Sequence, residues 1–316
     1  MLLVGFGVGL AVPRAAAADS NDLILNRLTT RTTDASGNLT MVVPQSLEFR
    51  ALASELGVVL APHLLTPADT VGFAGFQFTV DAAATTIDRG GAYWHAREGA
   101  QTPSSLRTVG FFARKGIWFP VPSFELGVGA VHLVDSNTWT GQLYAKVALA
   151  EGYHDLPLPS LAVRGAVSRM MNQRELDLTI ASLDVIVSKH VGVGGTWRFD
   201  PYAGWNLLAI IPRSEVIDAT PNIDSLSPGH VEDSMLNFVF KDQQNITRNR
   251  FLVGAKLQYS IVQLTLEAAF ALAGTSVDDR SGTSTPCTPN GTTTACDAKD
   301  TAKAQRTIAL SAGVDF

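Results

Sequence analysis

Charged residues, cysteines and long apolar runs are all scarce in this chain of 316 residues. Charged side chains make up 17% of it, well below the roughly 25% of an average soluble domain. The formal net charge of -5 excludes the basic surface that nucleic-acid binding requires. Beyond the first twenty or so residues, no apolar run approaches the roughly 18 residues of a membrane-spanning helix. With 46% hydrophobic residues, the chain is either a globule with a large core or a membrane barrel in which apolar and polar positions alternate.

The N-terminus has the pattern of an export signal. An apolar stretch over residues 1–12 leads into the small residues Ala15 to Ala18, as before a signal-peptidase site. The basic residues expected ahead of the apolar stretch are missing, which a start codon assigned too far downstream would explain. We predict a signal peptide over residues 1–18, cleaved near Ala17 or Ala18. The alternative is a buried N-terminal strand or helix.

The two cysteines, Cys287 and Cys296, lie in a segment rich in Ser, Thr, Pro and Gly. A disulfide between them would persist only in an oxidising compartment, which agrees with export. The alternative of two metal ligands lacks both the CxxC spacing and a nearby histidine. We predict the disulfide, and we expect neither a metal nor a cofactor.

One segment has a clear helical period. Residues 44–57 place four apolar side chains on one stripe, begin with a proline and end at Gly57, as helices often do. The four are Leu47, Ala51, Leu52 and Leu56. We predict that residues 19–66 form a periplasmic or plug segment that contains this helix.

From about residue 67 onward, apolar and polar residues alternate in segments separated by turn residues. The segment from Phe251 to Tyr259 is typical, with Val253 and Leu257 on one face and Lys256 on the other. Such segments have the length of tilted membrane strands, roughly 9–11 residues. Aromatic residues also fall near segment ends, where membrane interfaces place them. The alternation predicts an all-β fold, a closed antiparallel transmembrane β-barrel over residues 67–316, with about 12 strands and a range of 10 to 14.

The predicted strands cover 71–81, 91–97, 105–115, 122–133, 138–150, 158–170, 175–188, 190–199, 201–211, 250–260, 263–274 and 305–316. The links 212–249 and 275–304 are long, and we expect them to be outer loops. Short links near 134–137, 171–174, 200–201 and 261–262 are expected at the opposite end. The alternation changes phase near residues 181–183, which predicts a β-bulge.

The chain ends in an alternating segment, IALSAGVDF, whose last residue is Phe316. With the export signal and the repeated amphipathic segments, this end resembles bacterial outer-membrane β-barrel proteins, a superfamily with porin-like and fatty-acid-transporter-like members. The resemblance implies location in the bacterial outer membrane, with outer-membrane lipid and the barrel-assembly machinery as partners. It also implies that Phe316 and Val314 form the C-terminal assembly signal. Because a barrel in lipid can leave no strand edge open, the final strand should pair with the first.

Charged residues on the strands should face the lumen, because an Arg or Lys facing lipid at mid-membrane costs roughly 2–4 kcal/mol. Seven candidates follow from this argument: Asp81, Arg114, Glu125, Lys146, Arg164, Lys256 and Glu267. Their mixed signs fit two interpretations. They form internal salt bridges that fill a narrow barrel, or they form a constriction that selects solutes by charge.

No catalytic motif accompanies the six histidines, and we expect that the protein is not an enzyme. Three functional hypotheses follow. The first is a passive channel or transporter for small solutes of unknown identity. The second is a structural or surface-interaction barrel with a filled lumen that acts through its outer loops. The third is a soluble secreted all-β protein.

Overall fold

The computed structural model describes residues 19–119, 123–151, 158–221, 236–244, 246–276 and 299–316. The predicted signal peptide and both cysteines lie outside the described residues. Within them, no helix is long and apolar enough to cross a membrane.

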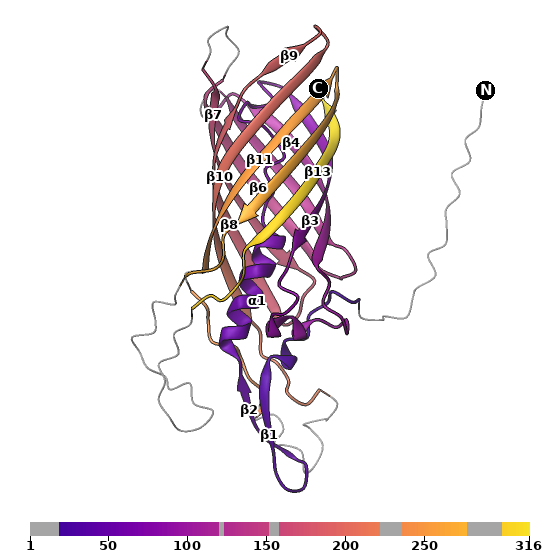
Figure 1. The fold of residues 1–316 in the computed structure, drawn as a ribbon, viewed down its shortest axis with the longest axis vertical. Helices are drawn as coiled ribbons and strands as arrows, with labels where there is room; N and C mark the ends of the chain where they lie inside the picture. Colours follow the sequence, from indigo (N-terminus) through magenta and orange to yellow (C-terminus); the bar gives the residue numbers. More distant parts are fainter. Residues whose placement is uncertain (1–18, 120–122, 152–157, 222–235, 245, 277–298) are drawn as a thin grey trace, which may run out of the picture.

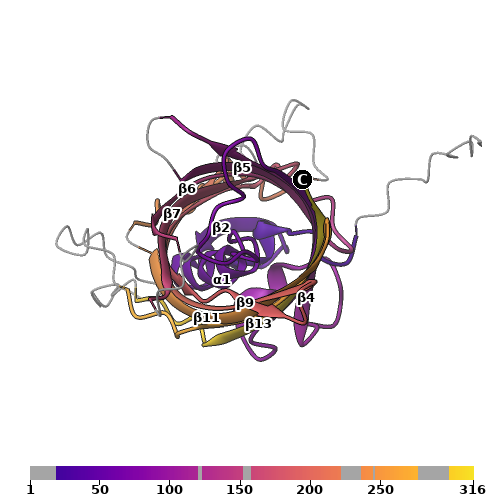
Figure 2. The same cartoon turned by 90° about the horizontal axis from the view of Figure 1, so that it is seen from above.

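Ten strands of the described residues close into an antiparallel barrel (Figures 1 and 2). Each strand pairs with its neighbours in sequence, and β13 pairs with β3, as predicted. The ring therefore has no open edge, which is what lipid requires. Its strands are β3 (Phe76–Thr86), β4 (Ser105–Ile117), β5 (Phe124–Leu133), β6 (Trp139–Ala150), β7 (Ser160–Met171), β8 (Leu176–Ser188), β10 (Trp197–Ser214), β11 (Ile246–Tyr259), β12 (Val262–Ala271) and β13 (Gln305–Asp315). The predicted closed antiparallel barrel is confirmed.

The strand count differs from the predicted twelve at two places. Residues 91–97 contain a 3-10 helix, η2 (Ala92–Ala96), whose aromatic side chains are buried beside the N-terminal helix rather than alternating on a sheet. The predicted strands 190–199 and 201–211 are largely one strand, β10, which continues through Pro201. Only the short β9 (Val191–Val193) precedes it, outside the ring.

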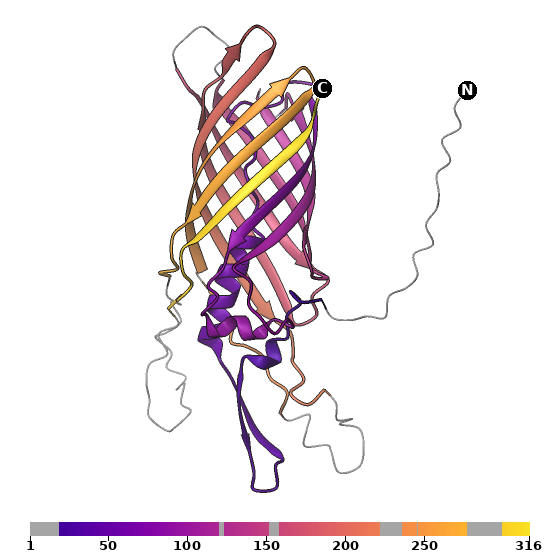
Figure 3. The ribbon, with the colours of Figure 1, turned by 45° about the vertical axis from the view of Figure 1, so that its right-hand side comes forward.

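Because residues 91–97 are not a strand, every strand from β4 to β8 runs in the direction opposite to the predicted one. The prediction that short and long links lie at opposite ends of the barrel is therefore wrong. The links 134–138 and 172–175 lie at the same end as the long links 215–245 and 272–304. We call this the loop end. The turn 260–261 lies at the opposite end, beside Phe316, and we call that the Phe316 end (Figure 3).

The outer face of the barrel is apolar on every strand. Large exposed apolar side chains point outward from the sheet, where water-facing sheets carry polar groups. One such residue from each strand in turn is Phe78, Phe111, Val128, Leu143, Val167, Leu183, Ile211, Val253, Leu266 and Leu310. This is the outward band expected of a barrel in lipid.

A helix, α1 (Ser46–Val59), lies in the mouth of the barrel at the loop end (Figures 1 and 2). It packs on inward-facing Leu178, Ile180, Leu208 and Ile210 in the main hydrophobic core. Gly57, predicted as the end of the helix, lies inside it. A Cβ there would come within 2.6 Å of Ile210 Cδ1, so the close approach of helix and strand requires glycine.

The same packing explains why the predicted bulge near residues 181–183 is wrong. Strand β8 keeps an uninterrupted alternation of buried and partly exposed residues. Its inward side chains are apolar where they contact α1 and polar at Ser182 and Asp184, so the face changes character while the register does not. The irregularity in this part of the sheet falls instead between Ala148 and Ala150 of β6.

The N-terminal residues extend away from the barrel at the loop end. The short η1 (Leu25–Arg27) is followed by a hairpin of β1 (Thr29–Thr33) and β2 (Leu39–Pro44) that projects beyond α1 (Figure 3). At its tip, the Asp34 carboxylate accepts hydrogen bonds from the backbone of Ser36 and Asn38, both at 2.8 Å. The hydrogen bonds, that of Asn38 first, hold the pKa of Asp34 below its ordinary value.

Candidate functional site: the occupied lumen

Residues 60–75, which we call the luminal segment, run from α1 through the barrel to the start of β3 at the Phe316 end (Figures 1 and 2). The segment has no regular secondary structure along most of its length. Its backbone polar groups therefore need partners from the barrel wall, since an unpaired buried N–H or C=O is costly.

Cationic side chains of four strands bind the carbonyl groups of the luminal segment. Arg250 Nη2 donates to Pro62 O at 2.6 Å, and Arg164 Nη1 donates to His63 O at 2.9 Å. Lys146 Nζ donates to Asp69 O at 2.8 Å and to Pro67 O at 3.3 Å. A longer contact of 3.5 Å joins Arg114 Nη1 to Leu65 O.

Anionic and hydroxyl groups bind the amide groups of the same segment. Glu267 Oε2 accepts from Leu65 N at 2.8 Å, and Glu125 Oε2 accepts from Val71 N at 2.9 Å. Between them, Ser188 Oγ accepts from Ala68 N at 3.0 Å. Side chains of the barrel wall thus supply donors to the carbonyl groups and acceptors to the amide groups along the length of the luminal segment.

The charged wall residues also pair with each other across strands. Arg164 and Asp184, direct neighbours on β7 and β8, are 2.6 Å apart, and both side chains are 1% exposed. Lys146 and Glu125, neighbours on β6 and β5, are 3.2 Å apart and fully buried. Each ion thus has a counter-ion as well as a hydrogen bond to the luminal segment or a wall side chain, which is the condition for a buried charge to be tolerated.

All seven predicted lumen residues are buried inside the barrel. Five of them bind the luminal segment: Arg114, Glu125, Lys146, Arg164 and Glu267. Lys256 instead pairs with Asp315 at 3.3 Å. Asp81, 6% exposed, lies on the inward face of β3.

Sequence reasoning missed Asp184 and Arg250. Asp184 follows the apparent change of phase, and Arg250 stood at the edge of a predicted loop. The cost of a charge in lipid would have assigned both to the lumen, had β8 been given a single register and β11 its full length.

At the loop end, Glu55 of α1 is a buried hydrogen-bond centre. Its carboxylate accepts from Tyr93 Oη at 2.8 Å, from Trp94 Nε1 at 2.9 Å and from Asp88 N at 3.1 Å. Burial and the neighbouring Glu55 raise the pKa of Tyr93, so its hydroxyl stays a neutral donor. Glu55 therefore joins α1 to the link between β3 and β4.

Other side chains of α1 contact the bases of the two longest links. Arg50 Nη1 donates to Gln244 O at 2.8 Å, and Arg50 Nη2 to Ser276 Oγ at 3.0 Å. Ser54 Oγ donates to Asp300 Oδ2 at 2.5 Å. The helix consequently fixes where both links leave the barrel.

Asp22 holds the N-terminal residues to the link 134–138. Its carboxylate accepts from Ser136 Oγ at 2.8 Å, Asn137 N at 2.7 Å and Asn137 Nδ2 at 2.8 Å. Burial alone would raise the pKa of Asp22, but the hydrogen bonds from Asn137 and Ser136 outweigh it and lower the pKa below its ordinary value.

We expect Asp22→Asn to lower the free energy of unfolding by about 1 kcal/mol at neutral pH. Because the native pKa lies below the unfolded value of about 3.9, the contribution of Asp22 is complete above that value and is lost as pH falls through the native pKa. Urea unfolding of wild type and variant should therefore differ at neutral pH and converge in acid, once the pH has fallen through the lowered native pKa. A difference that stays constant into strong acid would contradict this.

The described residues contain no group of three or more His, Cys, Asp or Glu side chains arranged to hold a metal ion. No family model and no curated protein matches the chain.

The closed ring and its apolar outer face determine the class of the fold. The chain has the architecture of an outer-membrane β-barrel. Similar solved structures are Neisserial surface protein A (NspA), the outer-membrane protease OmpT from Escherichia coli, and Ail, the attachment invasion locus protein of Yersinia pestis.

The sequence identities to this chain are 12% for NspA, 8% for OmpT and 7% for Ail, with TM-scores of 0.31, 0.35 and 0.25. The matches cover 76%, 79% and 77% of this chain and 96%, 98% and 99% of the other chains. At these scores and identities, none of the three carries an argument about function.

Proposed function

We propose that this protein is an outer-membrane barrel with a filled lumen, which acts at the cell surface through its N-terminal segment and long links. The proposal extends the second of the three sequence-based hypotheses, which named the outer loops alone. The observation that carries it is the binding of the luminal segment by Arg250, Arg164, Lys146, Glu267 and Glu125. The proposal assigns no catalytic role to the chain.

Opening a passive channel would require the luminal segment to leave. Its departure would remove hydrogen bonds from charged groups such as Lys146 and Glu125, whose side chains are fully buried. A buried charge deprived of partners costs several kcal/mol, and the cost would recur at each wall residue that binds the segment. This cost favours a lumen that the segment occupies permanently over a channel that opens when the segment leaves.

Barrel orientation supports a surface role. Outer-membrane barrels place their longer links outside and their short turns in the periplasm. By this rule the loop end, with the links 215–245 and 272–304, faces outward. The hairpin of β1 and β2 extends from that same end (Figure 3). The contacts of the barrel with outer-membrane lipid, and recognition of Phe316 and Val314 by the assembly machinery, remain predictions.

The two strands β1 and β2 pair only with each other among the described residues. Most of their residues are exposed, including Met41 at 48%. An isolated two-stranded hairpin is only marginally stable in water, and its free edges can accept a strand from another chain. The hairpin is thus the part of the loop end best suited to contact a partner.

Cysteine labelling in whole cells tests the proposal. In a background with Cys287→Ser and Cys296→Ser, the variant Ser36→Cys places a thiol at the exposed hairpin tip, and Ile261→Cys places one in the turn at the Phe316 end. A membrane-impermeant maleimide should label the first variant in intact cells and the second only after the outer membrane is permeabilised. The reverse pattern, or equal labelling, would overturn the proposed orientation and the surface role.

A further inference from the structure

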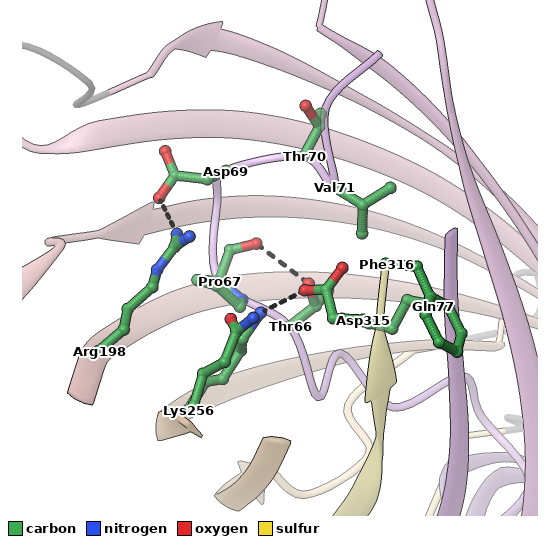
Figure 4. Close-up of a pocket in the computed structure, with 11 residues that line it drawn as sticks. Thr66, Pro67, Asp69, Thr70, Val71, Gln77, Arg198, Lys256, Asp315 and Phe316 are labelled. Carbon is green, nitrogen blue, oxygen red and sulfur yellow. Dashed lines mark hydrogen bonds and ion pairs between the residues drawn. The ribbon is translucent and has the colours of Figure 1, made fainter. Parts of the chain in front are cut away.

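A cavity of about 240 Å³ lies inside the barrel at the Phe316 end (Figure 4). Its wall includes Asp69, Thr70 and Val71 of the luminal segment, together with Arg198, Lys256 and Gln258 of strands β10 and β11. The volume is below the roughly 300–1,000 Å³ of pockets for drug-sized ligands. It therefore suits a molecule of only a few heavy atoms.

Both cations in the cavity wall already have carboxylate partners. Lys256 Nζ is 3.3 Å from Asp315 Oδ2. Arg198 Nε donates to Asp200 Oδ2 at 2.7 Å, and Asp200, which does not line the cavity, also pairs with His190 at 2.6 Å. The positive charge at the cavity is thus largely neutralised by groups of the protein itself.

Asp69 differs from Asp315, the other wall carboxylate, because it forms a long ion pair but accepts no described hydrogen bond. The residue is 5% exposed, and among the described residues neither carboxylate oxygen has a hydrogen-bond partner. Its nearest cation, Arg198 Nη2, is 3.8 Å from Oδ2, beyond hydrogen-bond distance (Figure 4). An amide oxygen of the same wall, Gln258 Oε1, is also buried without a described donor. Buried polar groups in native proteins nearly always have partners.

We infer that this cavity binds the ammonium group of a small aliphatic primary amine. The oxygens of Asp69 and Gln258 that have no described hydrogen-bond donor are all acceptors, so they fit a ligand that donates several hydrogen bonds and carries positive charge. Pro67, Val71 and Phe316 in the same wall provide apolar contacts for a short alkyl chain. The inference does not depend on the proposed surface function, since the cavity lies at the opposite end of the barrel.

A divalent metal fits the cavity less well. Calcium takes 6–8 oxygen ligands and often several carboxylates, whereas Asp315, the other described carboxylate in the wall, is held by Lys256. A quaternary ammonium would bring charge but no N–H donor. The chemistry that satisfies both acceptors is therefore a primary ammonium.

Titration of the purified, detergent-folded full chain with n-propylammonium tests the inference, with heats of binding or ligand-observed NMR as the readout. Neutral n-propanol, tetramethylammonium and Ca²⁺ serve as comparison probes. The variant Asp69→Asn keeps the shape and removes the charge. Asp135→Asn is the matched control, because Asp135 is an exposed aspartate at the loop end. Gln258→Met tests the second acceptor.

We expect saturable binding of n-propylammonium that Asp69→Asn weakens at least tenfold, that Gln258→Met weakens several-fold, and that Asp135→Asn leaves unchanged. The neutral and quaternary probes should bind at least tenfold more weakly. Equal binding to wild type and folded Asp69→Asn, equal binding of n-propanol, or tighter binding of Ca²⁺ would each overturn the inference. If Asp69→Asn does not fold, unchanged binding to Gln258→Met would overturn it.

Discussion

Arg164→Met is expected to lower the free energy of unfolding by about 3–5 kcal/mol, the range for removing one partner of a buried ion pair. Methionine replaces the aliphatic part of the arginine side chain but not its guanidinium. Asp184, whose side chain is 1% exposed, therefore loses its ion-pair partner at 2.6 Å. The substitution also removes the hydrogen bond to His63 O, so the luminal segment should become more accessible to protease. Urea unfolding in a fixed detergent or lipid measures the first effect, and limited proteolysis the second.

Arg169→Met is the control on the same two strands. Arg169 pairs with Asp177 at 2.8 Å, but its side chain is 68% exposed. An exposed pair contributes about 0–1 kcal/mol, so this variant should remain close to wild type. Equal losses for Arg164→Met and Arg169→Met would mean that the Arg164 pair is not buried in a filled lumen.

Glu55→Ala is expected to destabilise the protein by about 4 kcal/mol or more. The change leaves Tyr93 Oη, Trp94 Nε1 and Asp88 N without their acceptor inside a buried cluster, and each orphaned donor costs roughly 1–3 kcal/mol. Because α1 also positions the bases of the long links, we expect faster proteolysis in the links 215–245 and 272–304.

Glu48→Ala provides the comparison within the same helix. Glu48 lies in the first turn and is only partly buried, so its loss should cost at most about 1 kcal/mol through the helix dipole. If Glu55→Ala unfolds at the same urea concentration as Glu48→Ala, the hydrogen-bond cluster around Glu55 does not hold the helix.

Period-2 alternation was sufficient to predict the barrel, because lipid outside and a polar lumen inside impose opposite demands on successive residues. It was sufficient for β12, where Leu264 and Leu266 face outward and Thr265 and Glu267 face inward. It failed where the interior is apolar. Strand β8 faces α1 through the apolar Leu178 and Ile180, while Asp177 and Thr179 lie on its outward face. At Ser182 and Asp184 the polar residue is the inward one, so the pattern looked like a bulge.

The path of the luminal segment could not be predicted from the sequence. Residues 60–75 have no periodicity, and their partners lie on strands far along the chain, such as Arg164 and Glu267. The lipid cost identified which charged residues face inward, but not what they bind. A row of inward charges of both signs fits ion pairs, a charged constriction or a bound peptide backbone equally well, and only the closed barrel shows which of these the wall residues contact.

We propose that the luminal segment closes the barrel to solutes. Conductance of the purified wild-type protein in a planar bilayer is the decisive measurement, with a variant lacking residues 19–71 as the comparison. We predict no discrete conductance steps from inserted wild-type protein, and steps from the deletion variant if it inserts. Regular steps from the wild type, at low voltage and without denaturant, would contradict the claim and restore the passive channel as the function to test.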